Sequence, residues 1–160
     1  MIPIQKAKSI IQKHIPLLEV ETVSLNNTGN RVLAQDIVAT FPMPMFDNSA
    51  MDGFAVRSID TKGASKANPI SLKMVSVSSA GAPSDVTLGH GECVQCMTGA
   101  KIPHSADAIV MVEDTSGFSD DDNVEIYLEA DSGKHIRIKG EEIKEDDVLI
   151  HKGRHLTPSE

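Results

Sequence analysis

The chain has 160 residues and a mass of 17.2 kDa, which suits one ordinary domain or two small ones. Hydrophobic residues make up 40% of it and aromatic residues only 3%, so its core must be aliphatic and a stacking platform for single-stranded nucleic acid is nearly excluded. The net charge of −8 opposes binding to a phosphate backbone, so we expect no nucleic-acid partner. No apolar run reaches the ~20 residues of a membrane span, and no signal peptide is apparent. We therefore expect a cytoplasmic protein with no membrane partner.

Apolar residues recur at helical spacing near the start of the chain, which predicts an amphipathic helix over residues 3–15. Pro42 and Pro44 then mark a boundary. Because proline fixes φ and restrains the residue before it, we expect residues 41–45 to run extended without ladder hydrogen bonds.

Short apolar runs separated by turn residues occupy most of the remaining chain. The runs cover residues 54–57, 70–77, 92–97, 108–113, 124–129, 135–139 and 147–150. Many short strands with regular turns predict a β-sandwich or barrel-like domain.

A zinc site formed by His90, Cys93, Cys96 and His104 is one interpretation of the spacing of these residues. However, residues 92–97 are typical of a strand, on which residues three apart point to opposite faces. We therefore expect Cys93 and Cys96 to diverge, as ordinary core or surface residues.

Polar residues gather in the loop from Asp47 to Gly53, which contains two carboxylates, an amide and a hydroxyl. Such residues favour turns, so the loop needs no function to explain it. It is equally suited to present oxygen ligands, and Asp52 alone would be a sufficient protein ligand for Mg²⁺, which keeps several waters.

A second loop of small residues, 97–103, follows the strand expected at 92–97. Its free backbone N–H groups and the Thr98 hydroxyl would suit an anion, although an ordinary turn before Pro103 explains it as well. Glu113 ends the strand expected at 108–113, at the mouth of a loop. A glycine turn and a pair of carboxylates follow Arg137.

Together these segments resemble the MoeA and gephyrin E-domain family in four ordered blocks. Residues 44–56 (PMFDNSAMDGFAV) resemble the family's P-x-F-D-N-S-A-M-D-G-Y/F-A-V signature. Residues 98–103 (TGAKIP), followed by 106–110 (ADAIV) and Glu113, resemble its T-G-A-x-x-P…A-D-A-V-V…E block. Arg137 with Gly140 and Glu141 resembles R-x-x-G-E-D, and Gly153 with residues 156–158 resembles G-x-x-L-x-P.

The resemblance implies a mixed α+β, mostly β fold with an elongated segment built from both chain ends. That linker and dimerisation domain would comprise residues 1–45 and 143–160, and an inserted β-barrel or sandwich-like domain, residues 46–142, would carry half of the active cleft. Family members are homodimeric molybdopterin molybdenumtransferases, which insert molybdate into adenylylated molybdopterin and release AMP with the help of Mg²⁺.

The resemblance also assigns roles to residues of this chain. Asp52, Thr98 and Glu142 would be the catalytic contribution of the β-domain, with Asp52 as the Mg²⁺ ligand. The expected contacts to substrate are Ser49, Gly53, Gly99 and Glu113. Glu142 departs from the family's usual Asp, and its extra methylene would shift the carboxylate by more than about 1 Å.

The family's third, pterin-binding domain has no counterpart in these 160 residues. We therefore expect this chain to be the N-terminal portion of a molybdenumtransferase and to be inactive alone. The alternative is a non-catalytic binding or scaffold module that retains the fold. The cleft pattern of Asp52, Thr98 and Gly99 favours the enzyme.

Overall fold

The computed structural model describes residues 2–119 and 121–160. The chain divides into two compact units, one comprising residues 2–38 and 148–160 and the other residues 39–147. A single α-helix and nine strands make up the regular structure of the described residues, together with three short 3₁₀ helices, so the mostly-β prediction is confirmed. The assignment of a dimerisation domain and a cleft-bearing domain stays a prediction.

The first unit contains the helix, and it lies close to its predicted range. Helix α1 spans Ile4–His14 and follows Pro3, whose fixed φ suits a helix start. A 3₁₀ helix, η1, spans Leu25–Asn27. Strand β1 (Ile37–Val38) pairs antiparallel with β9 (Val148–Ile150), so the two ends of the chain meet in one unit.

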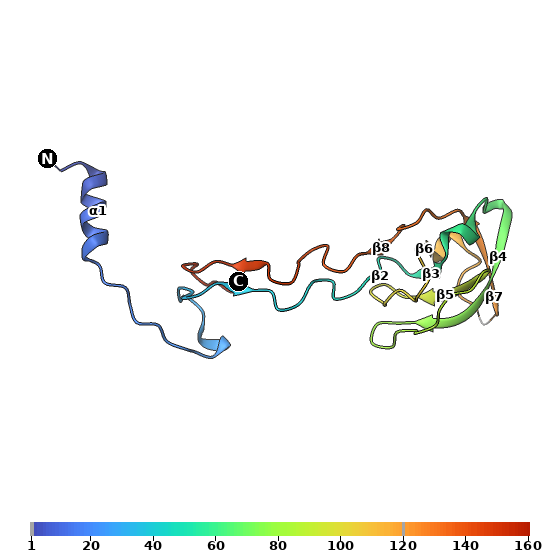
Figure 1. Cartoon of the computed structure of the whole chain (residues 1–160), viewed down its shortest axis with the longest axis horizontal. Helices are drawn as coiled ribbons and strands as arrows, with labels where there is room; N and C mark the ends of the chain where they lie inside the picture. Colours follow the sequence, from blue (N-terminus) through green and yellow to red (C-terminus); the bar gives the residue numbers. More distant parts are fainter. Residues whose placement is uncertain (1, 120) are drawn as a thin grey trace. The chain divides into compact units, whose positions relative to one another are not determined.

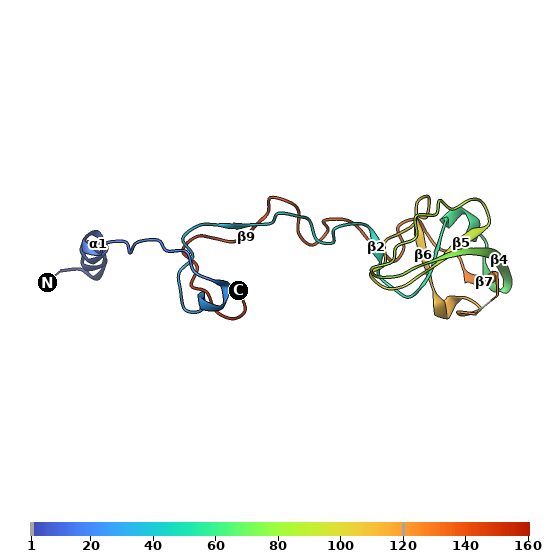
Figure 2. The ribbon, with the colours of Figure 1, turned by 90° about the horizontal axis from the view of Figure 1, so that it is seen from below.

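The second unit is built on one curled sheet of five strands in the order β6-β3-β5-β4-β7 (Figure 1). The strands are β3 (Gly53–Val56), β4 (Ser65–Ser78), β5 (Glu92–Cys96), β6 (Ala108–Met111) and β7 (Asn123–Leu128). Strand β3 pairs antiparallel with β5 and β6, whereas β4 pairs parallel with β5 and antiparallel with β7. The long strand β4, which lies between β5 and β7, is strongly curved and gives the unit its half-barrel curl (Figure 1; Figure 2 shows the same unit turned by 90°).

Four smaller elements complete the second unit. Strand β2 (Asn48–Ser49) pairs antiparallel with β8 (Ile136–Arg137). The 3₁₀ helices η2 (Ser58–Thr61) and η3 (Val112–Asp114) follow β3 and β6. The strand predicted over 108–113 is therefore too long, because the chain turns into η3 after Met111.

The middle of the sheet is buried on both faces. Phe54, Val56 and Cys93 belong to one apolar cluster, and Ala55, Val94 and Cys96 belong to the other. Because side chains alternate along a strand, each central strand contributes to both clusters. The divergence of Cys93 and Cys96 is confirmed, and both are free, buried thiols.

The proline segment differs from its prediction. Met43 donates its backbone N–H to Ile143 C=O at 2.8 Å and accepts from Ile143 N–H at 3.1 Å. The expectation that residues 41–45 lack ladder hydrogen bonds is therefore wrong. Pro42 and Pro44 have no N–H to give, but the residue between them keeps both of its own backbone groups.

Candidate functional site

Asp52 and Thr98 lie side by side at the edge of the sheet where β3 begins and the neighbouring strand β5 ends. Asp52 precedes β3 and Thr98 follows β5, and the antiparallel register sets Gly53 opposite Cys96. Asp52 Oδ1 accepts hydrogen bonds from the Thr98 hydroxyl and from the Thr98 backbone N–H, each at 2.7 Å. Both residues are exposed, so this hydrogen-bonded pair is open to a ligand.

The two hydrogen bonds hold Asp52 as a carboxylate. The Thr98 hydroxyl, followed by the Thr98 amide, lowers the pKa of Asp52 from its ordinary value, because both donors favour the charged form. Asp52 Oδ2 accepts no hydrogen bond within the part of the chain that the structure describes. The pair therefore presents an ionised oxygen in a fixed orientation.

The donors at this edge fit a magnesium ion better than a transition metal. Across residues 2–119 and 121–160, no three His, Cys, Asp or Glu side chains converge on one point. Mg²⁺ is commonly held by one or two carboxylates together with waters and substrate phosphates, so Asp52 with its available Oδ2 is a suitable protein ligand.

Ser49 joins the loop that carries Asp52 to the loop that carries Thr98. The Ser49 N–H donates to Ala100 C=O at 3.0 Å, and the Gly99 N–H donates to Ser49 C=O at 2.8 Å. The Ser49 hydroxyl donates to Met51 C=O at 2.5 Å within its own loop. Ser49 is fully buried, whereas Gly99 is exposed. Of these two expected substrate contacts, only Gly99 lies on the surface.

Gly53 is required by the close approach of β3 to β6. A Cβ atom at this position would lie 2.0 Å from Val110 O and 2.9 Å from Val110 C. Both atoms belong to the backbone of a paired strand and have no rotamer with which to withdraw. Gly53 is also buried, so its place next to Asp52 follows from sheet packing.

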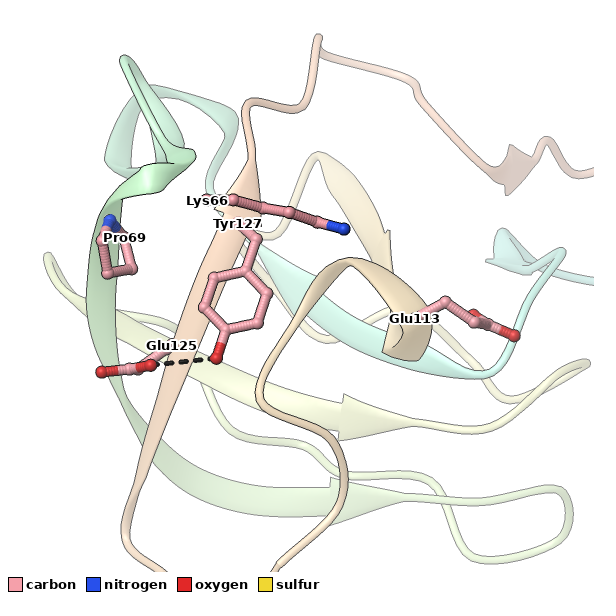
Figure 3. A pocket seen from close by; sticks show the side chains of 5 residues that line it. All are labelled: Lys66, Pro69, Glu113, Glu125 and Tyr127. Atoms are coloured by element: carbon pink, nitrogen blue, oxygen red, sulfur yellow. Dashed lines mark hydrogen bonds between the residues drawn. The ribbon is translucent and has the colours of Figure 1, made fainter.

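Glu113 lies on η3, which is tied to the same edge because the Val112 N–H donates to Asp52 C=O at 3.0 Å. It lines an open pocket of about 420 Å³ together with Lys66, Pro69, Glu125 and Tyr127 (Figure 3). The Tyr127 hydroxyl donates to Glu125 at 3.0 Å, while the Glu113 carboxylate points away from both of them (Figure 3).

Glu142 lies in a different hydrogen-bonded neighbourhood. Its carboxylate is 3.9 Å from the Arg137 guanidinium, and its backbone N–H donates to Met43 C=O at 3.0 Å. Within the described residues, no hydrogen bond or ion pair connects Glu142 with Asp52 or Thr98. The structure thus brings Asp52, Thr98, Ser49 and Gly99 into one connected set, and it leaves Glu142 outside that set.

Asp47 is a residue whose part in the site the sequence analysis did not identify. Asp47 Oδ1 accepts from the Lys139 N–H at 2.7 Å, and Asp47 C=O accepts from the Ile102 N–H at 3.1 Å. Asp47 therefore links three segments that contain candidate site residues. Its position in the polar loop 47–53 was the signal in the sequence, but the partner lies 92 residues away.

The chain is similar to known proteins over nearly its whole length. The family model for the MoeA N-terminal region (domain I and II) matches residues 2–160. The molybdopterin molybdenumtransferase of Staphylococcus aureus is 41% identical over 157 residues, which cover 98% of this chain and 37% of that protein. The Bacillus subtilis protein of the same name is 41% identical over 142 residues, or 88% of this chain and 33% of that one.

Solved protein structures are also similar to this chain. Two crystal structures of the molybdopterin biosynthesis moeA protein from Pyrococcus horikoshii match at 34% and 33% sequence identity, with TM-scores of 0.79 and 0.82. They cover 87% and 99% of this chain, but this chain covers only 36% and 40% of theirs. The chain spans less than half the length of these relatives, and its match to the family model runs over nearly all of its residues. It belongs to the MoeA family, of which it represents the N-terminal region.

Proposed function

We propose that this chain is the N-terminal portion of a molybdenumtransferase, which inserts molybdate into adenylylated molybdopterin and releases AMP in molybdenum cofactor biosynthesis. The names of its relatives support a transferase role in this biosynthesis. The observation that carries the proposal is the exposed Asp52–Thr98 pair, whose two 2.7 Å hydrogen bonds fix an ionised carboxylate at the sheet edge.

In this proposal the chain's own residues bind and orient the phosphate part of the substrate. Asp52 is the residue that would hold Mg²⁺, through the oxygen that Thr98 does not occupy. When bound, the metal would neutralise charge on the phosphate oxygens as the bond to AMP breaks. Thr98 keeps Asp52 in place, and the exposed Gly99 lets a substrate approach the backbone closely. Glu142 would contribute a second carboxylate to the cleft, without a hydrogen bond to the pair.

The rest of the site would come from the remaining part of a longer protein. Adenylylated molybdopterin is large and anionic, and the described residues that we place at this edge supply the single carboxylate of the Asp52–Thr98 pair and two loops. A pterin-binding domain, contributed within a homodimer, would complete the cleft. We therefore expect no turnover by the 160-residue chain alone.

Complementation by a chimaeric transferase tests the proposal. The chain would replace the matching N-terminal region of the Bacillus subtilis relative in a strain that lacks its own transferase. The readout would be the activity of a molybdenum-dependent nitrate reductase. The chimaera should restore activity, and Asp52→Asn should remove most of it. Asp131→Asn, which changes another exposed aspartate of the same unit, should leave activity intact.

Equal activity of the Asp52→Asn and Asp131→Asn chimaeras would refute the role of Asp52. A chimaera that accumulates as folded protein but restores nothing would favour the scaffold alternative.

A further inference from the structure

A second pocket, within residues 39–147, is lined in part by the loop that carries Thr98. Phe46, the turn 79–83, Gly99 and Lys101 line it, and its volume is about 260 Å³. Two of its walls continue directly from the candidate site, because Phe46 precedes the loop 47–53 and Gly99 follows Thr98. A ligand bound at the Asp52–Thr98 pair would therefore have this pocket next to it.

Hydrogen bonds hold the walls of this pocket in place before any ligand binds. Ser79 and Ala82 exchange backbone hydrogen bonds of 3.1 and 3.0 Å, which close the turn tightly. The Ser78 hydroxyl donates to Lys101 C=O at 3.0 Å and so ties that turn to the Thr98 loop. Ligand pockets are usually largely formed before binding, and this one meets that condition.

The lining suits a flat ring. Phe46 is 42% exposed, and Pro83 adds a second apolar surface. Gly81 and Gly99 both have positive φ, and a Cβ at either position would meet no described atom within 4 Å, so these walls face open space. A ligand can therefore approach the backbone closely at both glycines. Lys101 is the one charged residue in the lining, and its ammonium group lies 4.0 Å from Asp85.

We propose that this pocket holds the adenine ring, which is the flat nitrogen heterocycle at one end of the adenylylated molybdopterin substrate, since the pterin at the other end is left to the pterin-binding domain. This inference rests on the proposed function. The Phe46 ring would pack against the heterocycle, and Lys101 would face a phosphate oxygen of the same molecule. The volume lies just below the 300–1,000 Å³ that is common for drug-sized ligands, so it accommodates a ring system and not a whole nucleotide.

Adenine and pterin are the two heterocycles of that substrate, and direct binding to the 160-residue chain distinguishes them. Amide NMR spectra of the ¹⁵N-labelled chain would be recorded during titration with AMP, with neopterin and with ribose 5-phosphate. We expect saturable shifts at Gly81, Gly99 and Lys101 with AMP and none with neopterin. Ribose 5-phosphate, which lacks a flat heterocyclic base, should bind at least tenfold more weakly.

Two matched variants locate the binding. Phe46→Ala should weaken it by about tenfold, the size of effect found when an aromatic partner of a stacked base is replaced by alanine. Phe41→Ala changes a phenylalanine of similar exposure that does not line the pocket, and it should bind like the parent chain.

The proposal is overturned if AMP gives no saturable shifts at these amides. It is also overturned if neopterin or ribose 5-phosphate binds as well as AMP does, or if both phenylalanine variants bind equally. None of these results would affect the complementation by the chimaera, so failure of this inference is distinguishable from failure of the proposed function.

Discussion

Replacing Gly53 by alanine tests whether the site depends on the packing of β3 against β6. The added Cβ would lie 2.0 Å from Val110 O, far inside van der Waals contact, and 3.0 Å from Met111 Cα. The two strands must separate locally to admit it. Overpacking of a well-packed core typically costs about 1–3 kcal/mol. We expect the upper part of this range, because backbone atoms of a paired strand cannot rotate away.

Thermal unfolding measures this loss. For a chain of this size, about 3 kcal/mol corresponds to a Tm lower by roughly 6–12 °C. Gly89→Ala is the matched control: its Cβ would lie 3.1 Å from Glu92 Oε2, the far end of a flexible side chain, and its Tm should change by no more than a few degrees. If Gly53→Ala unfolds at the same temperature as Gly89→Ala, the close approach of β3 and β6 is not a constraint on this fold.

Three further predictions concern single side chains. Thr98→Ala should raise the pKa of Asp52 toward its ordinary value, measured by NMR titration of the Asp52 carboxyl carbon, whereas Thr98→Ser should keep it low. Because the folded-state pKa is lowered, the stability that this carboxylate contributes is present at neutral pH and is lost as the pH falls through that pKa, and Thr98→Ala should weaken this acid dependence. Burial raises the pKa of Cys93 to about 12 and that of Cys96 to about 11, so iodoacetamide at pH 8 should alkylate both thiols far more slowly in the native chain than in urea; equal rates would contradict their burial. Asp47→Ala should lower the free energy of unfolding by about 1 kcal/mol and speed hydrogen exchange at the Lys139 amide, and unchanged exchange there would show that Asp47 does not hold the turn after β8.

Periodicity alone was sufficient for helix α1 and for the two-sided burial of β5, but it gave wrong bounds for β4 and β6. The apolar spacing predicts α1 within one residue at each end, and the alternation along residues 92–97 correctly places Cys93 and Cys96 on opposite faces. Both features depend on residues that are near one another in the chain, so local rules determine them.

The pattern of apolar and polar residues could not predict which distant segments of the chain pair with one another. Asp52 and Thr98 are 46 residues apart, and nothing in either loop indicates that β3 and β5 are neighbours. The bridge between Met43 and Ile143 was missed because proline rules concern a residue's own backbone and not its partner. The resemblance to a known family brought Asp52 and Thr98 into one site, whereas Asp47 emerged only from its contact with Lys139.

Release of AMP from adenylylated molybdopterin in the presence of molybdate and Mg²⁺ tests the central claim most directly. Three proteins would be compared: the 160-residue chain, the chimaera that supplies the remaining region of the Bacillus subtilis relative, and the same chimaera with Asp52→Asn. We predict molybdate-dependent release by the chimaera, a loss of at least tenfold with Asp52→Asn, and no release by the chain alone. Release by the chain alone, or an undiminished rate with Asp52→Asn, would contradict the assignment of this edge as half of a transferase site.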